Sequence, residues 1–234
     1  MCGRFANDLP PGELARLFGT LNALPNVAPS WNVAPTQSAV VVRRNPESAE
    51  RSLDPLTWGL QPSWAKEGSK TPKPTNARAE TVTTSGMFKT AFAKRRCLVP
   101  AVAWYEWLAT PAGKMPYAFA RQDGMPLALA GLWEGRRGAD GEVTRSFAII
   151  TTEANAVARQ VHPRMPVVLE VASWPLWLGE AEGDAAALMR PAADDVVRSW
   201  RVGTRVNSVR NNAADLLVPQ AEPEVADNGG PNPA

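Results

Sequence analysis

The chain has 234 residues, of which 44% are hydrophobic and 21% are charged, and its formal net charge at pH 7 is +2. This length and apolar content allow one large domain, or two small ones, to bury a core without covalent staples, and so small a net charge does not by itself indicate a polyanionic partner. Two cysteines make no disulfide framework and no run of about 18 apolar residues marks a membrane span, so we expect a cytoplasmic protein, neither secreted nor membrane-bound.

The first half of the chain predicts one short helix followed mainly by strands. In "PPGELARLFGTL" the apolar residues have helical spacing, two prolines precede them and Gly19 follows, which is typical of a helix. The segment "SAVVVRR" (38–44) predicts a strand. Four further apolar runs are separated by Gly, Pro and Asp and predict successive short strands: 96–107, 115–122, 125–134 and 145–152.

The second half mixes both kinds of element. Residues 152–161 predict a helix with Thr152 as its N-cap, residues 165–170 a strand, and residues 173–179 and 184–200 two short helices. No internal repeat or linker interrupts the pattern, so we predict a single α+β domain over residues 1–218.

The C-terminal segment 219–234 differs in composition from the rest. It is rich in Pro and Gly and contains three acidic residues and no Lys or Arg, so the formal charge of the remaining chain rises from +2 to +5 when it is left out. Such a segment cannot bury enough apolar surface to offset its ordering entropy. We therefore predict a disordered acidic tail.

The second residue, Cys2, carries the first chemical signal. If Met1 is removed, Cys2 offers an α-amine with a pKa of about 8 and a thiol with a pKa of about 8.5, both usable nucleophiles near neutral pH. An aldehyde would form an imine with the amine, and the tethered thiol would close a five-membered thiazolidine ring with the advantage of proximity. The alternative is an incidental cysteine at a frayed terminus.

Two further residues are candidates for proton transfer. In "AVAWYEWL" strand alternation places Glu106 on one face with Trp104, and poor solvation there would raise the pKa of the carboxyl group. His162, the only histidine, lies in a predicted loop and can move protons near pH 7. The alternatives are an edge-strand glutamate reaching water and a structural histidine. A lone histidine and two distant cysteines do not suggest a metal site, and we predict no metal and no cofactor.

Several features suit a nucleic-acid strand. In "PTNARAET" alternation would point Asn76, Arg78 and Glu80 the same way, and an Asn beside an Arg suits an anionic, oxygen-rich group. Trp64 lies in a segment broken by Gly and Pro, where stacking on an unpaired base explains a Trp better than core packing does. Basic clusters at 43–44, 94–96 and 136–137 lie near aromatic residues, although each cluster alone is usually solvated surface.

Five segments, taken together and in this order, favour the functional interpretations of these residues over the alternatives: "MCGRFA", "WGLQPSWAK", "NARAET", "FKTAFAKRRCLVPAVAWYEW" and "TTEANAVARQVHPRMPVVL". Together they closely resemble the SOS-response-associated peptidase (SRAP) family, the abasic-site processing proteins, over roughly residues 2–220. The resemblance implies a single α+β domain with a β-rich, barrel-like, mixed or antiparallel core flanked by short helices. It also implies a protein that shields abasic sites in single-stranded DNA, and we expect a monomer that associates with the nucleoid when bound to DNA.

The resemblance also implies roles for individual residues. Cys2 would form a thiazolidine crosslink with the ring-opened sugar, Asn76 would position the sugar and the terminus, and Glu106 and His162 would move protons, with roles that can be exchanged. Arg78 would contact phosphate. Four more residues fall at positions that resemble DNA contacts: Arg4, Trp64, Phe92 and Arg164. Where the family commonly has a glycine-aromatic pair before "YEW", this chain has Ala103-Trp104, for which we expect a packing change without loss of chemistry.

Three other functions remain open at this stage. An N-terminal-nucleophile amidotransferase also begins Met-Cys-Gly, but no Asn-Gly-Glu-Ile-like segment follows here. A peptidase built on Cys2, Glu106 and His162 is the second, and the sequence supports self-removal of Met1 at most. A single-strand-binding module in which Cys2 plays no part is the third.

Overall fold

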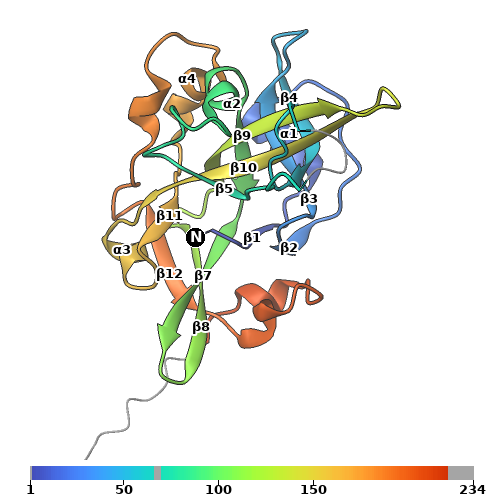
Figure 1. Cartoon of the computed structure of the whole chain (residues 1–234). Helices are drawn as coiled ribbons and strands as arrows, with labels where there is room; N and C mark the ends of the chain where they lie inside the picture. The colour runs from blue at the N-terminus through green and yellow to red at the C-terminus, as the bar shows by residue number, and fades with distance from the viewer. Residues whose placement is uncertain (1, 66–69, 221–234) are drawn as a thin grey trace, which may run out of the picture.

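The computed structural model describes residues 2–65 and 70–220. Its centre is a five-stranded β-barrel in which each strand pairs with the next and the last with the first (Figure 1). In their order around the barrel these strands are β3 (Ser38–Arg44), β4 (Arg51–Trp58), β10 (Val143–Glu153), β9 (Leu127–Arg137) and β6 (Arg96–Ala101). The pairings are antiparallel except β4 with β10, which is parallel. Two short strands extend β10: β5 (Asn76–Arg78) in parallel and β11 (Arg164–Pro166) in antiparallel orientation.

A second, five-stranded antiparallel sheet adjoins the barrel. Its order is β12 (Val197–Arg201), β8 (Gly113–Arg121), β7 (Ala103–Thr110), β1 (Phe5–Asn7) and β2 (Ser30–Val33). The barrel strand β6 and the sheet strand β7 are separated only by Val102, whose backbone N–H donates to the carbonyl of Ala6 at 2.8 Å. The chain therefore passes directly from barrel to sheet, and β1 docks at that passage.

The helices are short and lie at the outside of the barrel and sheet. In the described residues the α-helices are α1 (Pro11–Phe18), α2 (Lys89–Lys94), α3 (Ala156–Arg159) and α4 (Trp174–Leu178). Helix α1 confirms the sequence prediction: proline occupies its first turn, and Gly19 ends it with a φ of 65°, a left-handed conformation that glycine adopts without strain. Single turns of 3₁₀ helix follow at Val171–Ser173, Ala185–Leu188, Thr204–Asn207 and Ala214–Leu217.

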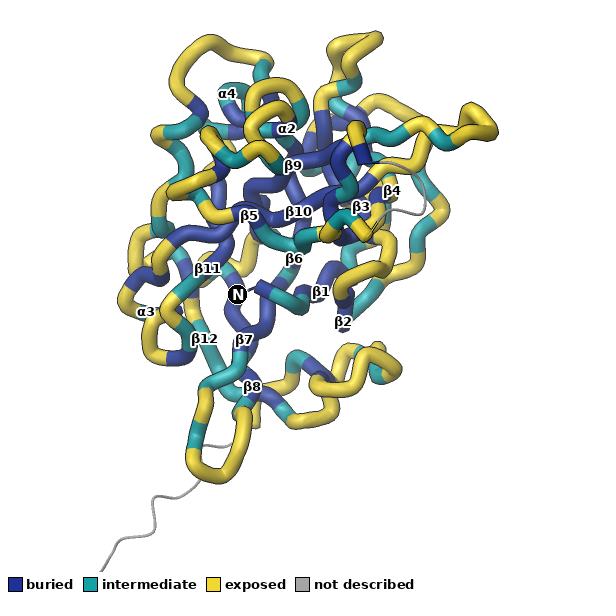
Figure 2. Tube along the Cα trace, in the orientation of Figure 1, coloured by how far each residue is buried: buried dark blue, intermediate teal, exposed yellow. Residues whose placement is uncertain are grey.

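The alternation of the barrel strands separates two cores. In β3, Val41 packs with Trp58, Cys97 and Phe147 in the cluster that also holds residues of the second sheet, whereas its neighbours Val40 and Val42 pack in the cluster covered by α1 and α4. Successive side chains of a strand point to opposite faces, so one valine run serves both cores. Figure 2 shows these strands as the continuous buried centre of the molecule.

The mixed fold with a barrel core and short flanking helices confirms the predicted fold class. The strand 38–44 has the predicted bounds, whereas the run 96–107 is divided between the strands β6 and β7 of different sheets. The helix predicted at 173–179 is confirmed by α4, whereas the other two helices predicted in the second half differ from the structure. Residues 152–161 contain only α3, because Thr152 pairs with Met165 in the sheet and Asn155 caps the helix instead. In 184–200 a single 3₁₀ turn is followed by the strand β12, which pairs with β8.

The predicted tail falls mostly outside the described residues. Of its sixteen positions only Pro219 and Gln220 are described, and both pair with the β12 region: Pro219 forms a bridge with Val202, and the Gln220 N–H donates to the carbonyl of Arg201 at 2.9 Å. Among the described helices, none combines the length and apolar character needed to cross a bilayer.

Candidate active site

The antiparallel pairing of β1 with β7 brings the start of the chain beside Glu106. Phe5 pairs with Trp104, and the N–H of Tyr105 donates to the carbonyl of Arg4 at 2.9 Å. Cys2 lies just before β1 with none of its surface exposed, in the core cluster that contains Phe5 and Trp104. Burial, and secondarily the negative charge of Glu106, raise the pKa of the Cys2 thiol far above its usual value. The thiol is therefore neutral in the chain as described.

Asn76 fixes the backbone of Cys2 from the barrel side. It occupies the first position of β5, where the parallel register with β10 places it opposite Ile149. Its Nδ2 donates to the carbonyl oxygen of Cys2 at 2.9 Å and to Oγ1 of Thr75 at 3.1 Å. The contact joins residues 74 positions apart in the chain, and it ties the first residues to the strand that carries Arg78.

An open cavity of about 420 Å³ adjoins Glu106. Its lining combines the residue before β1 with residues of β7, β8, the α3–β11 loop and a 3₁₀ turn: Arg4, Glu106, Trp107, Lys114, His162 and Asn207. The structure thus brings together three residues that the sequence singled out, Arg4, Glu106 and His162. Sequence reasoning missed Lys114 and Asn207, which lie in a hairpin and a 3₁₀ turn and carry no local signal of a site.

The two candidate proton carriers have altered acidities. Burial raises the pKa of Glu106 to about 7, as the sequence predicted, so near neutral pH the group is populated in both protonation states. Burial lowers the pKa of His162, which keeps the imidazole neutral near pH 7. Its Nδ1 accepts the backbone N–H of Arg164 at 3.0 Å, and because an amide always carries its proton, we assign the imidazole proton to Nε2.

Arg4 is held in place by the second sheet. One guanidinium nitrogen donates to Oδ1 of Asn32 at 2.7 Å and to the carbonyl of Val206 at 2.8 Å. The guanidinium also lies 5.8 Å from the ring centroid of Trp107, whose indole N–H donates to Asn207 at 2.7 Å. These contacts fix a cation at the edge of the cavity without neutralising it by a carboxylate among the described residues.

The remaining predicted DNA contacts lie in different surroundings. Arg78 ends β5 and is exposed, and its strand partner Thr151 also accepts, through its carbonyl, a 2.6 Å hydrogen bond from Arg164. Arg164 forms an ion pair with Glu80 at 2.6 Å, and Glu80 lies in the turn after β5 rather than on the strand. Trp64 is 62% exposed.

Phe92 differs from these residues. It lies on α2 and packs edge-to-face on Trp177, with ring centroids 6.1 Å apart, and it does not line the cavity beside Glu106. Its packing accounts for an aromatic residue at this position. In the described residues, no group of three or more His, Cys, Asp or Glu side chains gathers as metal ligands would.

The sequence model of the family described as SOS response associated peptidase (SRAP) matches residues 1–209. The chain belongs to the SRAP family. Among SRAP relatives, the abasic site processing protein YoqW of Bacillus subtilis is 32% identical over 223 residues, which cover 93% of this chain and 99% of YoqW. The abasic site processing protein YedK of Escherichia coli is 30% identical over 232 residues, covering 94% and 100% of the two chains.

A solved structure has the same fold. The crystal structure of a protein from Bacteroides thetaiotaomicron superposes with a TM-score of 0.82 over 94% of this chain and all of that one, at 21% identity. The barrel, the adjoining sheet and the short helices described above are therefore the arrangement found in that protein.

Proposed function

We propose that this protein recognises abasic sites in single-stranded DNA and forms a covalent crosslink with them through Cys2 after Met1 is removed. The proposal rests on one observation: Cys2, Asn76 and Glu106 lie close together where the barrel joins the second sheet. The cavity that Glu106 lines there is also lined by His162 and Arg4. The names of the SRAP relatives support the choice of an abasic site as the target.

The chemistry requires a free amine on Cys2. The α-amine adds to the aldehyde of the ring-opened deoxyribose, and loss of one water gives an imine. The thiol sulfur then bonds to the imine carbon and its proton passes to the nitrogen, which closes the thiazolidine ring. Because the nitrogen of Cys2 is part of a peptide bond in the chain that carries Met1, we place removal of Met1 before this reaction. Self-removal of Met1 is the only peptidase activity that we propose for this chain.

We assign proton transfer to two titratable groups that line the cavity, His162 and Glu106. An abasic deoxyribose is mostly a closed hemiacetal. His162 in its protonated form would give a proton to the ring oxygen as the aldehyde is released, and the imidazole would take up the proton that the anomeric hydroxyl loses. Glu106, with a pKa of about 7, would give a proton to the departing water and take one from the thiol. The same groups would catalyse the reverse reaction, since each step is reversible.

DNA binding would rest on cations and exposed aromatic surface. Arg4 at the cavity edge and exposed Arg78 would contact phosphates, and Trp64 would stack on an unpaired base. Arg164, which is paired with Glu80, would hold β11 and its loop in place and meet phosphate only if that ion pair opens. With a DNA substrate, the protein would act in the cytoplasm, on the nucleoid, and we expect it to act there as a monomer.

Intact mass spectrometry tests the proposal. The purified protein is mixed with an oligonucleotide that carries one abasic site, and we expect loss of Met1 together with an adduct equal to protein plus DNA minus one water. Cys2→Ala should give no adduct while it keeps salt-sensitive DNA binding. An adduct on a chain that retains Met1, or on Cys2→Ala, would contradict the proposal. The amidotransferase alternative predicts glutamine hydrolysis by the Met-free protein instead.

A further inference from the structure

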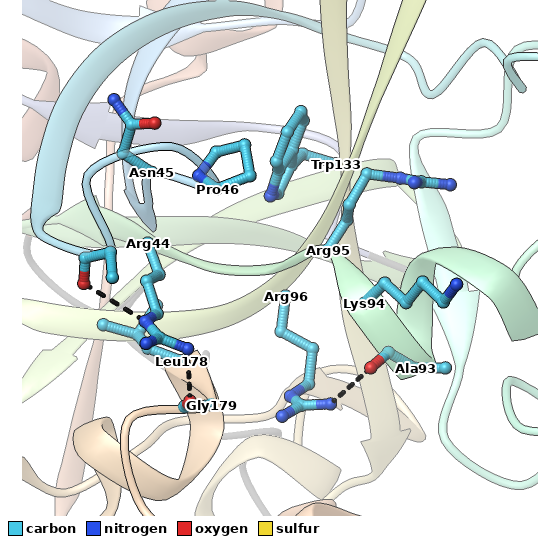
Figure 3. Close-up of a pocket in the computed structure, with 11 residues that line it drawn as sticks. Arg44, Asn45, Pro46, Ala93, Lys94, Arg95, Arg96, Trp133, Leu178 and Gly179 are labelled. Atoms are coloured by element: carbon cyan, nitrogen blue, oxygen red, sulfur yellow. Dashed lines mark hydrogen bonds between the residues drawn. The ribbon is translucent and has the colours of Figure 1, made fainter.

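A second, larger cavity of about 480 Å³ lies at the other end of the barrel strand β6. It is bordered by the end of β3 and the loop after it, the end of α2, the start of β6, and the end of α4 (Figure 3). From Arg96 at this cavity to Ala101 at the seam with the second sheet, β6 rises by about 17 Å. The cavity shares no lining residue with the one beside Glu106.

The lining is cationic. Arg44, Lys94, Arg95 and Arg96 contribute to it, and the described residues add no acidic side chain to the lining. Arg95 is neutralised by an ion pair with buried Glu134 at 2.7 Å. Glu180, next to the lining residue Gly179, is already paired with Arg51 at 2.7 Å. Glu134 and Glu180 are therefore occupied by Arg95 and Arg51, and the lining residues Arg44, Lys94 and Arg96 keep their positive charge.

Two of the arginines are positioned by carbonyl groups rather than by carboxylates. Arg44 donates from Nε to Ala49 at 3.1 Å and from Nη1 to Gly179 at 2.9 Å. Arg96 donates from Nε to Trp177 and from Nη1 to Phe92 at 2.8 Å. For both, the Nη2 group is not used in a hydrogen bond among the described residues, so each presents a fixed, charged donor that an anion can accept. Burial also lowers the pKa of Arg96.

The position of the Arg96 guanidinium, close to the end of α4, depends on a glycine there. A Cβ atom at Gly179 would lie 3.4 Å from Nη2 of Arg96, tighter than most such contacts, and Gly179 itself has a φ of 76°. The end of α4 therefore brings a carbonyl to Arg44, and the missing side chain of Gly179 leaves space beside Nη2 of half-buried Arg96.

A smaller cavity of about 290 Å³ continues this surface. It shares Asn45, Pro46, Arg95 and Trp133 with the larger cavity and adds Arg43 and Arg145, together with one acidic residue, Glu47. Arg43 lies 4.6 Å from the ring centroid of Trp133 and pairs with Asp54 at 2.8 Å. The two cavities form one basic trough across the end of the barrel.

We propose that this trough is a phosphate-binding site, separate from the Cys2 centre, in which Arg44, Lys94 and Arg96 hold phosphate groups. Arginine and lysine donors without acidic partners in a cavity of this size fit phosphates of a DNA strand or of a free polyphosphate. A DNA strand bound here would anchor DNA that extends beyond a lesion at the Cys2 centre. This anchoring role rests on the proposed function, whereas phosphate binding itself does not.

The test uses the full-length protein and lesion-free DNA, so that it is independent of covalent capture. Binding to single-stranded oligonucleotides of about 5 and about 20 nucleotides, which bracket the site sizes of single-strand-binding folds, is measured by fluorescence anisotropy at several salt concentrations. Tripolyphosphate binding is measured by calorimetry. The variants are Arg44→Gln/Lys94→Gln and, because Arg44 also joins β3 to α4, the exposed Lys94→Glu alone. Exposed Arg16→Gln on α1, which lines neither cavity of the trough, is the matched control.

We expect the double variant to reduce the slope of log affinity against log salt for the longer oligonucleotide by about 1.4, the effect of two lost phosphate contacts on a single strand. Lys94→Glu should weaken binding in the same direction, and Arg16→Gln should leave it unchanged. A loss confined to the longer oligonucleotide identifies the ligand as a strand, and a loss of tripolyphosphate binding identifies a free anion. Slopes and tripolyphosphate affinities equal to those of Arg16→Gln would overturn the proposal, whether or not the adduct at Cys2 forms.

Discussion

Glu106 links the chemistry of the site to the stability of the protein. Its pKa in the folded chain is about 7, above the ordinary 4.5, because the carboxyl group is buried. Between these two values the folded state holds more protons than the unfolded state, so the free energy of unfolding falls as pH rises from about 4.5 to about 7. The shift corresponds to about 3 kcal/mol for this group.

Denaturant unfolding at pH 5 and pH 8 checks this expectation. Wild type should lose stability between the two values, and Glu106→Gln, whose neutral amide resembles the protonated carboxyl, should lose about 2–3 kcal/mol less. Equal losses for the two proteins would mean that Glu106 is ionised well below pH 7. The same variant should also slow crosslink formation and reversal, since it cannot exchange a proton.

Asn76 offers a test of positioning. Asn76→Ala removes the hydrogen bond to the Cys2 carbonyl, and a net contribution of about 1 kcal/mol would slow crosslinking by roughly fivefold. Loss of Met1 should be unchanged, because the cysteine and its amine are intact. Single-turnover rates with an abasic oligonucleotide measure the effect, and thermal melting controls for folding. A wild-type rate would remove Asn76 from the mechanism.

At the scale of single elements, close packing inside the barrel is the most sharply constrained feature. A Cβ atom at Gly131 would lie 2.9 Å from Sγ of Cys97 and 3.0 Å from Cγ2 of Val99, on the strand β6 that pairs with β9. Gly131→Ala should therefore destabilise the protein by about 1–3 kcal/mol.

Cys97→Ala, which removes the nearer sulfur, provides the second half of a double-mutant cycle. We expect the double variant Gly131→Ala/Cys97→Ala to be less destabilised than the sum of the single variants, because the two positions share the same space. Strict additivity in chemical denaturation would show that Gly131 is not limited by this contact.

Sequence patterns predicted correctly those helices and strands whose formation depends on neighbouring residues in the chain. The valine run at 38–44 and the proline- and glycine-bounded α1 appear as expected. Thr152 was predicted as a helix cap because threonine caps helices well, but its pairing with Met165 in the sheet outweighs that preference. The strand Val197–Arg201 was missed for the same reason, since its pairing with β8 joins residues about 80 positions apart.

The sequence indicated candidate site residues where a motif contains them. Cys2, Asn76, Glu106 and His162 stand in quoted segments that resemble the SRAP family, and strand alternation independently placed Glu106 in poorly solvated surroundings. The rest of the cavity depends on which hairpin and which 3₁₀ turn meet it in space. Lys114 and Asn207 are contributed in this way, so neither periodicity nor spacing could have identified them.

At the scale of the whole molecule, barrel and second sheet share one core. Phe5, Trp104 and Phe119 of the sheet pack in the same cluster as Trp58 and Phe147 of the barrel, and Phe5 meets Trp58 edge-to-face with ring centroids 5.1 Å apart. Neither part can lose this cluster without exposing apolar surface of the other. The proposed nucleophile Cys2 belongs to the cluster as well, so the candidate site and the fold depend on the same packing.

We therefore expect the described domain to unfold in one transition, in which near-ultraviolet circular dichroism of the tryptophans and far-ultraviolet signals of the strands coincide and the calorimetric and van't Hoff enthalpies agree. Phe5→Ala, at the contact between the two parts, should lower stability by about 3–5 kcal/mol while the transition stays single, because both parts lose the same support. Two resolved transitions in wild type, or a Phe5→Ala protein in which the barrel signal melts unchanged, would show that the barrel folds independently of the sheet that carries Cys2.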